Sequence, residues 1–93
     1  MANPVTEFPF EFLNVVDNQL VHTGRCVLHN IVINDGGAAT VTVWDGVAAA
    51  GTVVAIIDLN NALPVTLRFD VLCGTGIYLA FSAKAGNITV TWE

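Results

Sequence analysis

The chain is short of charge, and of positive charge above all. Of its 93 residues only 12% are charged, with eight acidic and three basic side chains and a net charge of −5. Soluble domains usually carry about 25% charged residues. Three scattered cations, Arg25, Arg68 and Lys84, cannot neutralise a nucleic-acid backbone or dock on an anionic membrane, so neither is expected as a partner.

The sequence also has no long apolar run, and its first residues do not have the pattern of a leader peptide. No stretch approaches the roughly 20 apolar residues that a membrane-spanning helix needs. Residues 1–7 have neither a basic start nor an apolar segment, so no signal peptide is expected. We therefore predict synthesis in a reducing cytoplasm, with Cys26 and Cys73 as free, buried thiols. A disulfide between them is the alternative.

Groups that could carry catalysis are scarce. Ser82 is the only serine, and no G-x-S-x-G turn surrounds it. Cys26 and His29 are three apart in one predicted strand, so their side chains point to opposite faces and cannot act as thiolate and base. His22 and His29 also fail as a metal pair, because a metal site needs three or four converging ligands. We predict no enzyme, no cofactor and no metal; the alternative is calcium bound by loop carboxylates. The candidates would be Asp35, Asp45 and Asp58.

What the sequence does have is alternation with a period of two. In residues 65–71 apolar side chains alternate with Thr66, Arg68 and Asp70, and residues 77–82 and 87–92 behave in the same way. Gly, Asn and Asp interrupt these segments at intervals of roughly ten residues, as turns require. About seven to eight short strands are expected. The pattern predicts an all-β fold, an antiparallel β-sandwich or jelly roll.

The first 18 residues differ from the rest. We assign residues 1–18 to an extended N-terminal arm and residues 19–93 to a single sandwich domain. Pro9 cannot donate to a ladder, which excludes a central strand there and favours an arm or an edge strand. The arm would cover either an edge of its own sandwich or a neighbouring subunit. The side chains expected to bind a partner are Phe8, Phe10, Phe12 and Leu13.

The apolar content exceeds what one small sandwich can hide. Hydrophobic residues make up 54% of the chain, and a domain of this size buries only about 60% of the surface that its unfolded chain exposes. Residues 25–34 and 52–57 are apolar on both predicted faces, as in strands that are covered on both sides. We therefore predict a homo-oligomer. The predicted interface residues are His29, Ile31, Val54 and Ile56.

Three parts of the sequence are similar to small virion proteins of tailed bacteriophages. The first is TGRCVLHNIVIN followed by DGG at 23–37. The second is VTVWDG at 41–46 with GTVVAIID at 51–58. The third is the ending, GTGIYL at 74–79 with GNITVTW at 86–92. The arm lies outside these parts.

The resemblance implies a sandwich or jelly-roll fold and a place on the capsid surface of a virion. Such proteins are capsid decoration (cement) proteins that commonly sit as homotrimers over junctions between subunits of the major capsid protein. No catalytic residue is implied. The alternative is a receptor- or glycan-binding module of a tail or fibre, with Trp44, Tyr78 and Trp92 as candidate sugar platforms. The two tryptophans would otherwise close the ends of the core.

Overall fold

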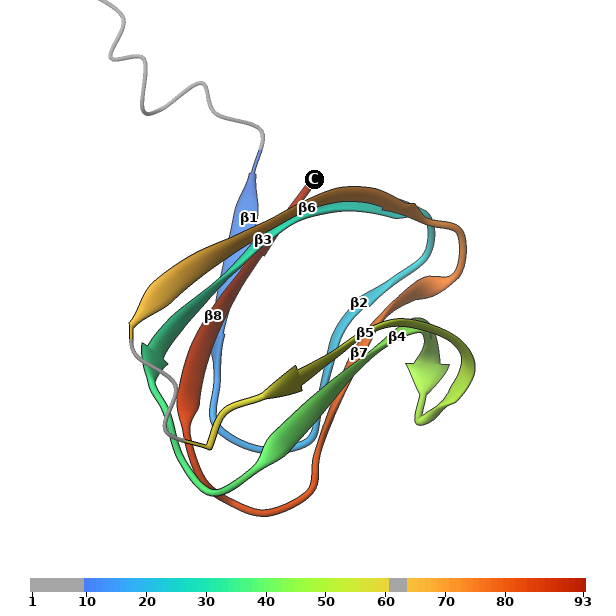
Figure 1. Cartoon of the computed structure of the whole chain (residues 1–93). Helices are drawn as coiled ribbons and strands as arrows, with labels where there is room; N and C mark the ends of the chain where they lie inside the picture. Colours follow the sequence, from blue (N-terminus) through green and yellow to red (C-terminus); the bar gives the residue numbers. More distant parts are fainter. Residues whose placement is uncertain (1–9, 61–63) are drawn as a thin grey trace, which may run out of the picture.

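The computed structural model describes residues 10–60 and 64–93, which form eight antiparallel strands in two facing sheets (Figure 1). One sheet has the order β1-β8-β3-β6 and the other the order β2-β7-β4-β5. The fold is an antiparallel β-sandwich, as predicted. Its strands are β1 (Glu11–Val15), β2 (Gln19–Thr23), β3 (Cys26–Asp35), β4 (Thr40–Ala48), β5 (Ala50–Asp58), β6 (Val65–Cys73), β7 (Gly76–Phe81) and β8 (Asn87–Trp92).

The core lies between the two sheets and follows from the alternation. In β8 the buried residues Ile88, Val90 and Trp92 alternate with Thr89 and Thr91, which face outward. The other central strands contribute buried side chains in the same way. The largest fully buried side chains are Leu28, Ile31, Leu59, Ile77, Leu79, Ile88, Val41, Val43 and Val90.

The sandwich begins earlier than the predicted boundary at residue 19. Residues 11–15 of the expected arm form β1, an edge strand that pairs antiparallel with β8. Val15 is buried and Leu13 packs against the core. This part of the arm therefore covers an edge of its own sandwich, and Phe8 and Pro9 lie outside the described residues.

A β-bulge corrects the prediction that β3 is apolar on both faces. The register of β3 with β8 shifts between Leu28 and Asn30, so His29 is an extra residue relative to β8. The register with β6 shifts at the same place, but there the extra residue lies in β6, between Arg68 and Val71. The bulge reverses the alternation, and Leu28, Ile31 and Ile33 all point into the core. Ile31 is completely buried within its own subunit, so it cannot contact a partner in this conformation.

β5 also contains a bulge. The strand keeps apolar side chains on both faces, as predicted, but the bulge changes which residues face the core. The register with β4 passes from Ala55 to Val53 and skips Val54. Val54 and Ala55 pack against the core, whereas Val53 is 42% and Ile56 68% exposed. Of the two predicted interface residues on β5, Ile56 therefore faces outward and Val54 is half-buried.

Asp45 lies in β4 and not in the turn that we expected. β4 continues past Asp45 to Ala48. The Asp45 carboxylate accepts hydrogen bonds from the backbone N–H groups of Gly74 (3.0 Å), Thr75 (2.8 Å) and Gly76 (3.3 Å). These bonds, chiefly those from Thr75 and Gly74, lower the pKa of Asp45. Asp45 thus ties the connection between β6 and β7 to β4.

Candidate functional site

The outer face of the β1-β8-β3-β6 sheet carries a polar network. Asn14 Nδ2 donates to Asn87 Oδ1 at 2.6 Å, and Asn34 Nδ2 donates to the same oxygen at 3.0 Å and to Thr89 Oγ1 at 2.9 Å. These side chains come from three neighbouring strands, β1, β8 and β3. Side chains that satisfy one another in this way suit a face in contact with water.

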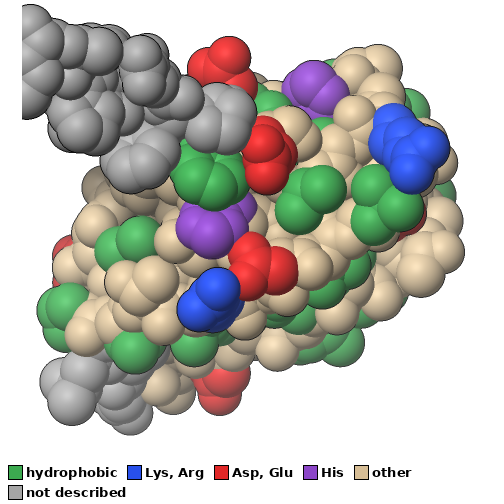
Figure 2. Space-filling view, turned by 90° about the horizontal axis from the view of Figure 1, so that it is seen from above, with side chains coloured by type: hydrophobic (Ala, Val, Ile, Leu, Met, Phe, Trp, Pro, Cys, Tyr) green, Lys and Arg blue, Asp and Glu red, His purple; other side chains and the backbone are tan. Residues whose placement is uncertain are grey.

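The bulge in β3 places His29 in a charged cluster on the same face. His29 Nδ1 lies 2.6 Å from Asp70 Oδ1 and donates to it, because a carboxylate only accepts. Arg68 Nε donates to Asp70 Oδ2 at 2.7 Å. The hydrogen bonds from Arg68 and His29 lower the pKa of Asp70. Histidine, acidic and basic side chains gather in this way on the face shown in Figure 2.

The charged cluster also contacts Phe10, the first residue that the structure describes. The ring of Phe10 stacks on His29 with a centroid distance of 4.2 Å and an interplanar angle of 14°. His29 Nδ1 is engaged by Asp70, and within the described residues no serine or cysteine bonds to the imidazole. The arrangement therefore positions Phe10 against the sheet.

The predicted partner-binding residues of the arm are not brought together. Phe10 stacks on His29, and Leu13 packs inward against the core. Phe12 points outward from β1 and is 72% exposed. Phe8 lies outside the described residues. Of the described members of the set, Phe12 presents the largest free apolar surface.

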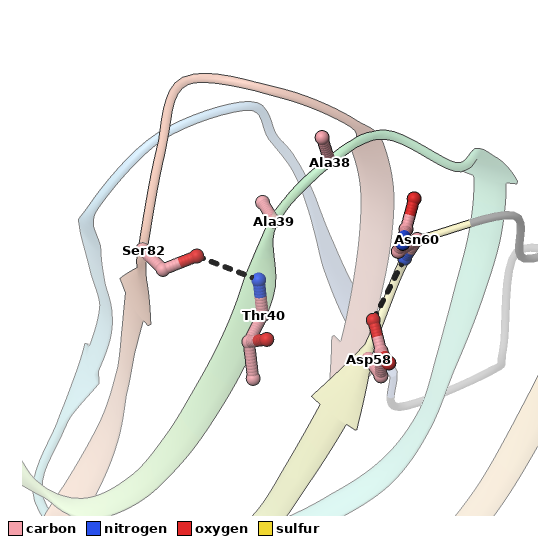
Figure 3. Close-up of a pocket in the computed structure, with 6 residues that line it drawn as sticks. All are labelled: Ala38, Ala39, Thr40, Asp58, Asn60 and Ser82. Carbon is pink, nitrogen blue, oxygen red and sulfur yellow. Dashed lines mark hydrogen bonds between the residues drawn. The ribbon is translucent and has the colours of Figure 1, made fainter.

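A polar pocket lies at one end of the sandwich (Figure 3). Its polar groups bind the local backbone: Ser82 Oγ accepts from Thr40 N at 2.8 Å, and Asp58 Oδ1 accepts from Asn60 N at 2.9 Å. One carboxylate is too few for a calcium site. Across residues 10–60 and 64–93, no three His, Cys, Asp or Glu side chains converge as metal ligands would.

The two tryptophans do not share a surface. Trp92 is 8% exposed and lies on the inner side of β8, where it closes the core. Trp44 is half-buried and pairs in register with Tyr78 of β7. Within the described part of the chain, Trp44 Nε1 is buried without a hydrogen-bond partner. A sugar platform could therefore use Trp44 and Tyr78 but not Trp92.

The outer face of the β2-β7-β4-β5 sheet carries an apolar row that crosses all four strands. Leu20 is opposite Tyr78, Tyr78 is opposite Trp44, and Trp44 is opposite Val53. Residues directly opposite each other on one face have their Cβ atoms about 5 Å apart. We call Leu20, Tyr78, Trp44 and Val53 the apolar row.

A second line of the same face runs beside the apolar row. It consists of Ala80, Thr42 and Ile56, again in register. Leu20 is 39% and Ile56 68% exposed, so water covers apolar side chains at both edges of the sheet. All three basic residues of the chain lie outside these four strands. This face carries apolar side chains across all four strands and no basic residue, which suits contact with another protein.

The apolar row could not be predicted from the sequence, because its members come from four separate strands. Only the register of the pairing aligns them. Trp44 and Tyr78 were singled out as aromatic candidates, and Ile56 as an interface residue, yet Leu20 and Val53 gave no signal of their own.

Comparisons of the chain with models of known families, with curated proteins and with solved structures find no match. Among the described residues, no helix is long and apolar enough to cross a membrane. The similarity to phage virion proteins therefore stays a prediction from the sequence.

Proposed function

We propose that this chain is a non-enzymatic structural protein of a virion, a capsid decoration (cement) protein that contacts the major capsid protein. The observation that carries the proposal is the difference between the two outer faces. The β1-β8-β3-β6 sheet carries an outer network of Asn and Thr and a charged cluster, with exposed Phe12 and Leu72 on its two edge strands. The other sheet presents the apolar row across all four strands. A protein that coats a shell needs one face for water and one for its neighbour.

The strand pairing favours a jelly roll. β1 pairs with β8, β2 with β7, β3 with β6 and β4 with β5, as in one long antiparallel ribbon folded over into two sheets. We infer a jelly-roll topology from this order. Jelly rolls are used in viral capsid and lectin domains, which agrees with the proposed class and with its alternative.

The proposed mechanism is mechanical. Burying apolar surface contributes about 25 cal/mol per Å², so a face that includes Trp44, Tyr78 and Ile56 can supply useful affinity. Many copies on one shell bind more tightly than a single copy, because each contact raises the effective concentration of the next. No bond is made or broken in this function.

The test is the occupancy of isolated capsids from the parent virus. Val53→Glu places a charge in the apolar row and should reduce the bound copies at least tenfold. Thr66→Glu is the matched control, because Thr66 is exposed on β6, in the other sheet. Full occupancy with Val53→Glu, or no binding of the unaltered chain to capsids, would contradict the proposal.

A second candidate is the glycan-binding module of a tail or fibre. It is favoured by the outward-facing pair Trp44 and Tyr78, since sugar rings stack on aromatic faces. Titration with a panel of glycans should then change the fluorescence of Trp44, while buried Trp92 supplies a constant background. A flat response, repeated with Trp44→Phe as the reference, would exclude this candidate.

A further inference from the structure

The sandwich has four edge strands, and three of them are protected against pairing with another chain. β1 and β2 contain five residues each, and β2 is interrupted by a register shift. β6 carries Arg68 and Asp70 on its exposed side, and Asp70 has a φ of 51° at a bulge. Short length, charge and bulges are the usual means by which proteins block their sheet edges.

The fourth edge strand, β5, is long and carries few such features. It has nine residues, AGTVVAIID, and Asp58 at its end is its only charged residue. It contains no proline and no lysine. Its bulge directs Val54 toward the core and adds no charge. By the same criteria this edge is open to a further strand.

The outer side of β5 has no partner within its own described chain. Among residues 10–60 and 64–93, the hydrogen bonds of residues 50–57 are those of the ladder with β4. A strand at the edge of a sheet leaves the alternate N–H and C=O groups free on its other side. β5 thus presents an unused set of backbone donors and acceptors beside exposed Val53 and Ile56.

We propose that two copies of this chain join by antiparallel pairing of their β5 strands. The absence of charge along β5 favours a second copy of this chain as the partner. A chain with a net charge of −5 repels its own copies over most of its surface, but residues 50–57 are uncharged. Antiparallel pairing also puts the two Asp58 side chains at opposite ends of the seam. The two outer faces then form one continuous apolar surface.

The biological role of this contact rests on the proposed function, because the pairing of β5 strands would join two copies of the decoration protein. It has two-fold symmetry, because the same strand is used on both sides. The result is a dimer, whereas the homotrimer implied by the resemblance would need a different contact. Ile56 lies beside the seam and gains cover from the second copy.

Light scattering on the purified full-length chain tests the dimer. The unaltered chain should have twice the mass of one chain at micromolar concentration. Ile56→Glu should weaken the association at least tenfold. Leu72→Glu is the control, because Leu72 is 54% exposed on β6, in the other sheet, and this variant should remain dimeric. A monomeric or trimeric unaltered chain, or a dimer that survives Ile56→Glu, would overturn the inference.

Hydrogen exchange of the same samples locates the contact. The amides in 50–58 that are not bonded to β4 should exchange at least tenfold more slowly when the protein is concentrated from the monomeric to the dimeric range, and those of β6 should not change. Protection absent from β5 would overturn the inference even if a dimer forms. Capsid occupancy is measured separately, so a monomer that coats capsids defeats this inference and leaves the proposed function standing.

Discussion

Cys26 lies directly opposite Cys73 where β3 pairs with β6, and both residues are free and buried, as the sequence analysis predicted. Burial raises the pKa of Cys26, and it raises the pKa of Cys73 to about 11. The thiolate is the reactive form of cysteine, so both side chains should be inert in the folded protein.

The first prediction follows from these thiols. At pH 8 the native protein should react with a thiol reagent such as DTNB at least a hundredfold more slowly than the unfolded protein. Two equivalents should react in denaturant. Rapid labelling of either thiol in the native state, or fewer than two equivalents after unfolding without reductant, would contradict the structure.

The second prediction concerns Asp45. Asp45→Ala leaves three loop N–H groups without their acceptor and should lower the free energy of unfolding by about 1–2 kcal/mol. Urea denaturation measures the change. Asp35→Ala is the control, because Asp35 is exposed, and it should shift the free energy by less than about 0.5 kcal/mol. Equal effects of the two variants would refute the role assigned to Asp45.

Asp45 should also make the stability of the fold depend on pH. The pKa of Asp45 is lower in the folded chain than its ordinary value of 3.8. The ionised carboxylate therefore stabilises the fold above pH 3.8, and this contribution is lost as the pH falls through the folded pKa. The stability difference between the unaltered chain and Asp45→Ala should shrink below about pH 4. A difference that stays constant down to pH 2 would show that charge plays no part.

The third prediction tests the bulge at His29. If the bulge brings Ile31 into the core, Ile31→Ala should cost about 2–5 kcal/mol of stability. Ile56→Ala, at a side chain 68% exposed, should cost less than about 0.5 kcal/mol in the monomer. Thermal and urea denaturation of dilute protein measure both. A small effect at Ile31 would mean that β3 keeps regular alternation.

The fourth prediction concerns the stack of Phe10 on His29. Ring current from Phe10 should shift the His29 ring protons upfield in the NMR spectrum, because the rings lie face to face. Phe10→Leu should remove the shift. Phe12→Leu should leave it unchanged, since Phe12 is exposed on β1, which β8 separates from β3. His29 signals that are insensitive to Phe10→Leu would disprove the contact in solution.

The fold class could be predicted from the sequence because alternation and turn residues are local signals. Ile88, Val90 and Trp92 show this: their spacing alone places them on one buried face. The boundary at residue 19 was placed too late, since Phe10 and Phe12 have the same period in an arm as in an edge strand. Only the pairing with β8 separates the two cases.

Bulges explain the other differences. Relative to β8, one extra residue at His29 moves Ile31 from the predicted surface to the core, and no residue type in that segment signals the insertion. The same shift brings His29 to Asp70, 41 residues away. The apolar row was hidden for a related reason, because its members are neighbours only through the register of four strands.

A density map of the parent virion, with this chain fitted, tests the central claim most directly. The account predicts the chain on the outer surface of the capsid, with Trp44, Tyr78 and Val53 buried against a neighbouring subunit and the Asn14–Asn34 face in water. A chain seated elsewhere on the particle, or one whose apolar row faces solvent, would contradict it.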